Sequence, residues 1–148
     1  QYDNLILSSS GKSACPFPPL EKEYAIAVPG ETDLPGWRIT ANVTKTATYD
    51  GNPWNPFTAF FDLDKTGPTL SVRPRKDGDR FQPLGMEQTR KLQDFMVDAK
   101  IPQHWRNTIP LVTSPSHILW IVGWRIDERV KTTVSTKNVL NLTFEKTD

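Results

Sequence analysis

Six cations lie close together between Arg73 and Lys91, in a segment interrupted by glycine and proline. The segment begins Val-Arg-Pro-Arg-Lys-Asp-Gly-Asp-Arg at Val72, and Arg90 follows ten residues after Arg80. Guanidinium and ammonium groups bind phosphate, and the planar fork of arginine matches its geometry. The pattern therefore predicts a surface that holds phosphate.

Part of this charge falls at the expected start of a helix. Apolar residues recur with the spacing of one helix face at Leu92, Phe95, Met96 and Ala99. This spacing predicts an amphipathic helix over residues 90–99 with Thr89 as its N-cap. Cations in a first helical turn are unfavourable by roughly a few tenths of a kcal/mol. We therefore expect the N–H groups of the helix start, the backbone at Gly85 and the side chains of Arg90 and Lys91 to hold one phosphate together.

The other cations follow a predicted strand. Leu70 and Val72 alternate with polar residues, which predicts a strand that places Arg73 and Arg75 on one face, about 7 Å apart. Pro74 has no backbone N–H to donate, which predicts that this strand lies at a sheet edge.

A second interpretation of the same charges requires no ligand. Arg90 can pair with Asp94 one turn later, and Arg80 can pair with Asp77 or Asp79, which leaves a solvated charged surface. Asp79 is expected to order the turn at Gly78 or to pair with a nearby arginine rather than to catalyse a reaction.

The remaining pattern is rich in strands. Alternating or continuous apolar runs predict strands near residues 24–28, 37–44, 57–63, 118–122 and 140–145. Pro102 predicts a second, short helix over about 102–107. Strands and helices do not alternate one for one, so the fold class is predicted to be α+β, a strand-rich sandwich-like domain with one main and one short helix.

Charge divides the chain unevenly. Residues 1–68 hold five Lys or Arg and eight Asp or Glu, whereas residues 69–148 hold thirteen and nine. A polyanionic partner would therefore meet the second part first. We predict a strand-rich segment over 1–68 that precedes a C-terminal domain over 69–148.

Several functional classes find no support. Cys15 is the one cysteine of the chain, so an internal disulfide is excluded, and no apolar run or leader pattern predicts a membrane span or export. We therefore expect a cytoplasmic protein. The residues Ser10 to Ser13 lack the first glycine of a phosphate-binding P-loop, and His104 and His117 lack ligand partners, so we expect neither catalytic residues nor a metal site.

The segment from Arg73 to Ile126 resembles the C-terminal domain of tRNA(Ile)-lysidine synthetase. The residues that carry the resemblance are Arg73, Arg75, Gly78, Asp79, Arg80, Pro83, Leu84, Gly85, Lys91, Leu92, Asp94, Phe95, Lys100, Ile101, Pro102, Arg106, Pro110, Trp120, Gly123, Arg125 and Ile126. The chain departs from the family at Glu87 and Gln88, where Gly-Gly is common, and this places a negative charge near the expected phosphate. The resemblance implies a fold similar to a sandwich module of the phenylalanyl-tRNA synthetase β-subunit.

The resemblance also implies a function. Enzymes of this family use ATP and magnesium in an N-terminal domain to attach lysine to the wobble cytidine of the minor isoleucine tRNA, which then reads AUA. The Ser-Gly-Gly-x-Asp-Ser signature of that domain does not occur in this chain, which begins at Gln1 and is expected to be a fragment. The fragment is therefore expected to bind the tRNA acceptor arm beside its own catalytic domain, without a cofactor. The expected tRNA-binding residues are Arg73, Arg75, Arg80, Arg90, Lys91, Lys100, Arg106 and Arg125.

An interaction module is the alternative. In that case Trp54, Trp105 and Trp124 would be exposed anchors that dock a catalytic domain or a second copy of the chain, as in a homodimer.

Overall fold

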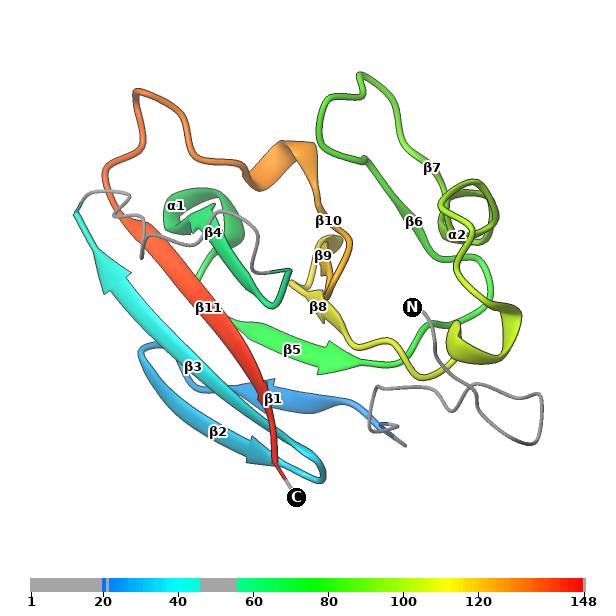
Figure 1. The fold of residues 1–148 in the computed structure, drawn as a ribbon. Coiled ribbons are helices and arrows are strands. Elements are labelled where there is room, and N and C mark those ends of the chain that lie inside the picture. Colours follow the sequence, from blue (N-terminus) through cyan, green and yellow to red (C-terminus); the bar gives the residue numbers. More distant parts are fainter. Residues whose placement is uncertain (1–19, 21, 46–55, 148) are drawn as a thin grey trace.

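The computed structural model describes residues 20, 22–45 and 56–147. The strands of this part form two main antiparallel sheets and a small hairpin (Figure 1). The five-stranded sheet has the order β1 (Tyr24–Ile26), β5 (Leu70–Arg73), β8 (Leu111–Thr113), β9 (Ile118–Ile121) and β10 (Arg125–Ile126). The four-stranded sheet has the order β2 (Gly30–Leu34), β3 (Trp37–Thr44), β11 (Val139–Lys146) and β4 (Thr58–Asp62). The hairpin pairs β6 (Arg80–Phe81) with β7 (Arg90–Lys91).

Helical segments are short. The two α-helices are α1 (Leu63–Thr66) and α2 (Leu92–Asp98), and two 3₁₀ turns are η1 (Gln103–Trp105) and η2 (Glu128–Val130). In the described part of the chain, no helix has both the length and the apolar character that crossing a membrane requires.

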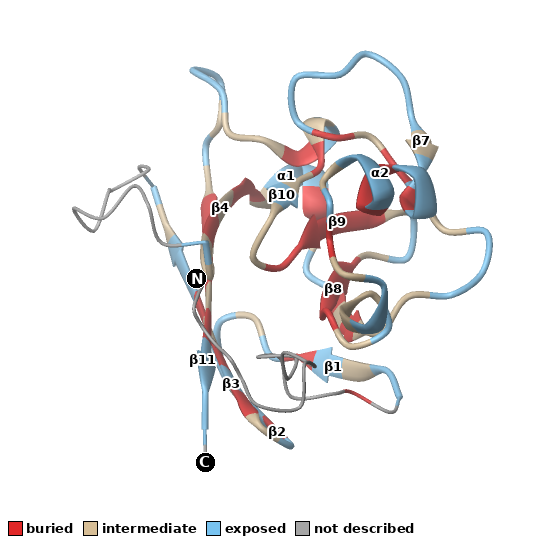
Figure 2. Cartoon of the chain, turned by 45° about the vertical axis from the view of Figure 1, so that its right-hand side comes forward, coloured by how far each residue is buried: buried red, intermediate tan, exposed pale blue. Residues whose placement is uncertain are grey.

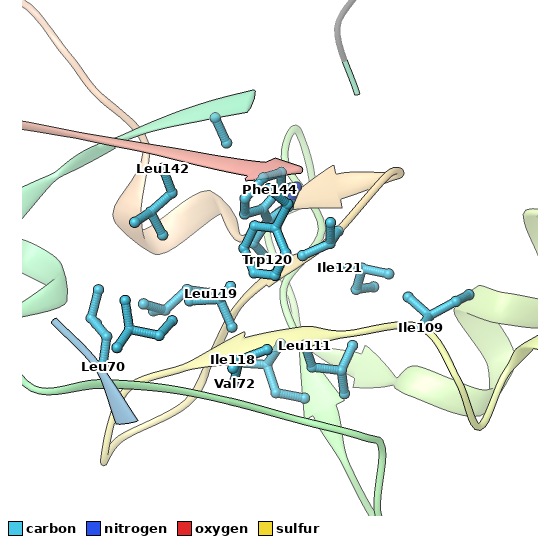
Figure 3. Packing of buried hydrophobic residues seen from close by; sticks show 14 of the residues in the cluster. Leu70, Val72, Ile109, Leu111, Ile118, Leu119, Trp120, Ile121, Leu142 and Phe144 are labelled. Atoms are coloured by element: carbon cyan, nitrogen blue, oxygen red, sulfur yellow. The ribbon is translucent and has the colours of Figure 1, made fainter. Parts of the chain in front are cut away.

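The two main sheets pack through aromatic contacts made by Trp120. The ring centroid of Trp120 in β9 lies 5.9 Å from that of Phe61 in β4 and 5.4 Å from that of Phe144 in β11. Leu119 and Ile121 extend this apolar core along β9 (Figure 3). Every residue of β8 and β9 is buried (Figure 2), so the side chains of these two strands belong to the core.

Residues from the first and second parts of the chain share both main sheets. β1 pairs with β5 in the five-stranded sheet, and β11 lies between β3 and β4 in the four-stranded sheet. Among the described residues, each main sheet therefore contains strands from both sides of the expected boundary between 1–68 and 69–148.

The architecture confirms the predicted strand-rich α+β sandwich, but it corrects one strand. β5 is not at an edge, because β1 pairs with it on one side and β8 on the other. Pro74 follows Arg73, the last residue of the strand, so its missing N–H lies outside the ladder. Arg73 and Arg75 do not share a strand face as predicted.

The predicted helix over 90–99 begins two residues late. Arg90 and Lys91 are extended and pair with β6, and the helix starts at Leu92 with Lys91 as its N-cap, without a side-chain cap from Thr89. The backbone N–H of Leu92 donates to the carbonyl of Asp79. The predicted apolar face is correct, since Leu92, Phe95 and Met96 are buried.

Truncation of Phe95 should destabilise the fold. Its side chain is 5% exposed and its ring meets that of Phe81 edge-on, with centroids 4.9 Å apart. Phe95→Ala should lower the free energy of unfolding by about 3–5 kcal/mol, measured by urea denaturation. Val97→Ala, on the same helix but 50% exposed, should change it by less than about 0.5 kcal/mol. Equal effects would contradict this assignment of the buried face.

Candidate nucleic-acid interface

Arg73 is held inside the protein by Asp79. Its two terminal nitrogens donate to the two carboxylate oxygens of Asp79, each at 3.0 Å, and one of them also donates to the carbonyl of Pro74 at 2.9 Å. Both side chains are only 12% exposed. Paired in this way, Arg73 has little capacity left for an external phosphate, and its role here is to hold the loop that follows β5.

Asp79 organises this loop further. Its carboxylate accepts the backbone N–H of Lys76 at 2.7 Å, and its backbone carbonyl accepts the N–H of Leu92 at 2.9 Å. Gly78 has a φ of +85°, a conformation that disfavours other residues, and open space lies where a side chain would begin. Asp79 thus both orders the turn and pairs with an arginine, as expected from the sequence.

The ordered turn forms one wall of a small cationic cavity. This cavity, the smaller of two described below, has a volume of about 220 Å³. It is lined by Arg75, Lys76 and Lys91, with Asp77 and Asp79 also at its wall. Because Arg73 neutralises Asp79, the positive charges are in excess there. The cavity is therefore suited to a phosphate.

Arg75 spans this region through neutral partners. Its Nε donates to the side-chain carbonyl of Asn107 at 2.8 Å, and a terminal nitrogen donates to the side chain of Gln93 in α2. These bonds fix the guanidinium and leave its charge without a carboxylate partner among the described residues. An arginine fixed in this way loses little side-chain entropy when it binds an anion.

Arg80 and Lys91 face each other directly across the β6–β7 hairpin. Side chains of opposed residues share one face of a hairpin, and like charges in that arrangement are destabilising. Arg80 donates only to Thr89, at 3.3 Å or more, and neither cation has an ion pair in the part of the chain that is described. An anion placed between them would remove this repulsion.

Two further cations lie at the other end of α2. Lys100 has a φ of 60°, the one positive value among the described non-glycine residues, in a turn where its N–H donates to Val97 and that of Ile101 donates to Met96. Glycine is usual at this position, because a side chain is strained there. Arg106 donates from Nε to the carbonyl of Ile101 at 3.1 Å, so it lies beside Lys100.

Two more of the expected cations, Arg90 and Arg125, also make contacts within the fold. Arg90 donates to the carboxylate of Asp98 at 2.6 Å, rather than to Asp94, and so bridges β7 and the end of α2. Arg125 is exposed and places its guanidinium carbon 5.5 Å from the ring centroid of Phe95, a cation–π contact.

The expected single-phosphate site at Gly85, Arg90 and Lys91 is wrong. The N–H of Gly85 donates to the side chain of Glu128 at 2.8 Å, and Arg90 is paired with Asp98. Lys131 and then the Gly85 N–H hold the pKa of the Glu128 carboxyl below its ordinary value. The Gly85 N–H and the Arg90 side chain, two of the donors expected to hold the phosphate, are therefore already bonded to the protein.

A larger cavity, with a volume of about 550 Å³, is also lined by Gly78 and Asp79. Arg80, His117 and Arg129 contribute to its lining. Arg129 donates twice to the fully buried carboxylate of Asp127, and this interaction raises the pKa of the arginine. Burial, and next the charge of Arg129, lowers the pKa of His117.

The expected set of tRNA-binding residues omitted two cations near these cavities. Lys76 stands beside the Asp77-Gly78 turn, and this position is the signal that could have added it to the expected set. Arg129 lies two residues after Asp127, and this spacing alone does not indicate a binding site.

The two described tryptophans of the alternative interaction module are not fully exposed side chains. Trp105 and Trp124 are partly buried and pack against the core, and Trp54 lies outside the described residues. No group of three or more potential metal ligands occurs among the residues described.

Residues 70–142 match the family model of the TilS substrate C-terminal domain. The chain is 40% identical over 143 residues to a tRNA(Ile)-lysidine synthase of Dehalococcoides mccartyi, a match that covers 97% of this chain and 30% of that protein. The chain belongs to the TilS C-terminal domain family. It is also 36% identical to a tRNA(Ile)-lysidine synthase of Caldanaerobacter subterraneus, over 98% of this chain and 30% of that protein. The chain thus spans about 30% of the length of these curated relatives.

Solved structures show the same fold. A crystal structure of a TilS C-terminal domain matches with a TM-score of 0.69 at 24% identity, over 86% of this chain and 99% of that one. An N-terminal fragment of the phenylalanyl-tRNA synthetase β-subunit from Pyrococcus horikoshii matches with a TM-score of 0.51 at 21% identity, over 59% of this chain and 27% of that one. The resemblance to the β-subunit module that the sequence implied is confirmed at the level of the fold.

The paired geometry of Arg73 gives a stability prediction. Arg73→Lys keeps the charge but loses the two-pronged bond to Asp79. It should lower the free energy of unfolding by about 1.5–3 kcal/mol, measured by urea denaturation. The same change at exposed Arg125 should alter it by less than about 0.5 kcal/mol. A silent Arg73→Lys variant would show that the pair does not hold the loop.

His117 gives a pH prediction. Its pKa is lowered in the folded state by burial and Arg129, so between the ordinary value near 6.5 and this lower value the unfolded chain binds more protons. Stability should therefore fall as the pH drops below about 6.5, and level off below the folded-state pKa. His117→Asn should reduce this loss between pH 7 and 5 in urea denaturation, whereas His104→Asn should not. An unchanged pH dependence in His117→Asn would contradict the assignment.

Proposed function

We propose that this chain is the tRNA-recognition portion of a tRNA(Ile)-lysidine synthase and that it binds the acceptor arm of the minor isoleucine tRNA. The observation that carries this proposal is the 40% identity to a named tRNA(Ile)-lysidine synthase over 97% of the chain. The cations beside the hairpin and α2 supply a physical means of binding.

The reaction of the whole enzyme belongs to the same proposal. The enzyme is a ligase that uses ATP to attach lysine to the wobble cytidine, so that the tRNA reads AUA. We assign ATP, magnesium and the reacting groups to a catalytic domain outside these 148 residues, because the chain matches only 30% of its relatives' length. The cytoplasmic location stays a prediction.

Binding in this scheme is mainly electrostatic. Lys76, Arg80 and Lys91 lie around one turn and lack ion-pair partners among the described residues, while Lys100 and Arg106 extend the charge to the far end of α2. A double-stranded RNA is recognised mainly by its shape, its phosphates and its 2′-hydroxyls. The cations therefore supply affinity, and the fixed shape of the surface supplies selectivity between tRNAs.

The alternative interaction module has no comparable support. Its two described tryptophans pack against the core, and the family relationship supplies no such role. Whether the chain also forms a homodimer stays a prediction that light scattering can address.

Filter binding to the isoleucine and methionine tRNAs at about 50 and 200 mM salt tests the proposal. The double variant Arg80→Ala with Lys91→Ala should weaken binding by about a hundredfold or more at the lower salt, since charged hydrogen bonds each contribute about 1.5–3 kcal/mol. It should also reduce the slope of log affinity against log salt by about two, one for each phosphate that the variant can no longer bind.

A charge-matched control separates local contacts from net charge. Lys137→Ala with Lys146→Ala removes the same charge from exposed positions before and within β11, distant from the hairpin (Figure 1). Its affinity should stay within about twofold of the unaltered chain, because phosphate contacts act at short range in salt. Equal weakening by the two double variants would contradict the proposed surface, and a chain with no tRNA affinity would contradict the function.

A further inference from the structure

The larger cavity has the size and the polar lining of a ligand-binding site. The proposed contacts between the surface cations and the RNA backbone leave this cavity without a role. Its volume of about 550 Å³ lies within the range of small-ligand pockets. Residues far apart in the sequence line it, from the turn after β8, the Gly78 turn and η2. Thr89 and Ser114 also line it, and their hydroxyl groups are hydrogen-bonded to the Arg80 side chain and to the His117 carbonyl.

Arg129 is fixed in this cavity before any ligand arrives. Its Nε and one terminal nitrogen each donate to Asp127 at 2.9 Å, while its side chain remains 36% exposed. Asp127 is fully buried and also accepts the backbone N–H groups of Gln82 and Arg129. A planar guanidinium held in this way offers a flat face for a nucleobase at little entropic cost.

Arg80 is the second cation of the cavity. It has no carboxylate partner among the residues described, and it lies opposite Lys91, which lines the smaller cavity. Asp79 in the wall is neutralised by Arg73, and Glu23 is exposed to solvent. A phosphate on Arg80 therefore lies next to the surface that binds the RNA backbone.

We propose that the larger cavity binds one unpaired nucleotide of RNA, with its phosphate on Arg80 and its base against the guanidinium face of Arg129. This inference rests on the proposed function, since it takes RNA as the ligand. It adds a subsite for a single-stranded segment to a surface that otherwise recognises the outside of a duplex.

A carboxylate placed at the cavity wall tests the subsite without disturbing the core. Ser116 lines the cavity, is exposed, and contributes only its backbone N–H to the described hydrogen bonds. Ser116→Glu is compared with Ser135→Glu, the same change in another exposed turn. The probes are an unpaired RNA trinucleotide and an RNA duplex closed by loops at both ends, titrated against the 148-residue chain and followed by backbone amide NMR.

The trinucleotide should shift the amides of Gly78, His117 and Arg129 in a saturable way. Ser116→Glu should raise its Kd at least tenfold, while Ser135→Glu leaves it within twofold and neither variant alters duplex affinity beyond twofold. Absence of these shifts, an unchanged Kd, or equal weakening for trinucleotide and duplex would overturn the subsite. Failure of the chain to bind tRNA, with trinucleotide binding retained, would overturn the proposed function and leave the subsite standing.

Discussion

The carboxylate of Asp79 fixes the segment on which both cavities depend. It accepts two bonds from Arg73 at the end of β5 and one from the backbone of Lys76, while the carbonyl of the same residue accepts the first N–H of α2. One residue therefore joins a central strand, a turn and a helix. Because Gly78 and Asp79 line the larger and the smaller cavity alike, loss of this carboxylate would remove the bonds that hold a segment common to both. A mostly buried acidic group is thus required for the shape of a cationic surface.

The fold divides its cations into two groups that look alike in the sequence. Arg73, Arg90 and Arg129 pair with aspartates and hold loops, strands and 3₁₀ turns in place. Arg80 and Lys91 have no such pair in the described part of the chain and face outward together. Ion pairing within the fold reduces what a cation can contribute to an external phosphate. The capacity for binding therefore depends on where the aspartates fall after folding, and not on the density of positive charge along the chain.

Sequence patterns predicted the elements that local periodicity determines. Alternation predicted β3 and β11, and a continuous apolar run predicted β9, because each of these strands buries a regular set of side chains. β8 was missed because three buried residues between Pro110 and Ser114 show no period. The predicted start of α2 and the predicted edge position of β5 were wrong, because β7 pairs with β6 and β1 pairs with β5. Arg73 and Arg90 could be predicted as members of the cationic set, whereas Arg129 could not, and the partners of all three arise from tertiary contacts.

Two local rules are broken at the two ends of α2. Arg80 faces Lys91 just before the helix, and Lys100 occupies a conformation suited to glycine just after it. Each arrangement reduces the stability of the free chain, and such violations concentrate at functional sites. Lys91 and Lys100 are nine residues apart, roughly 13 Å along a helix, so one extended polyanion can contact both. An anion that relieves this repulsion binds only the folded state of the chain. Its binding therefore stabilises the region in which the two arrangements lower the stability of the unbound protein.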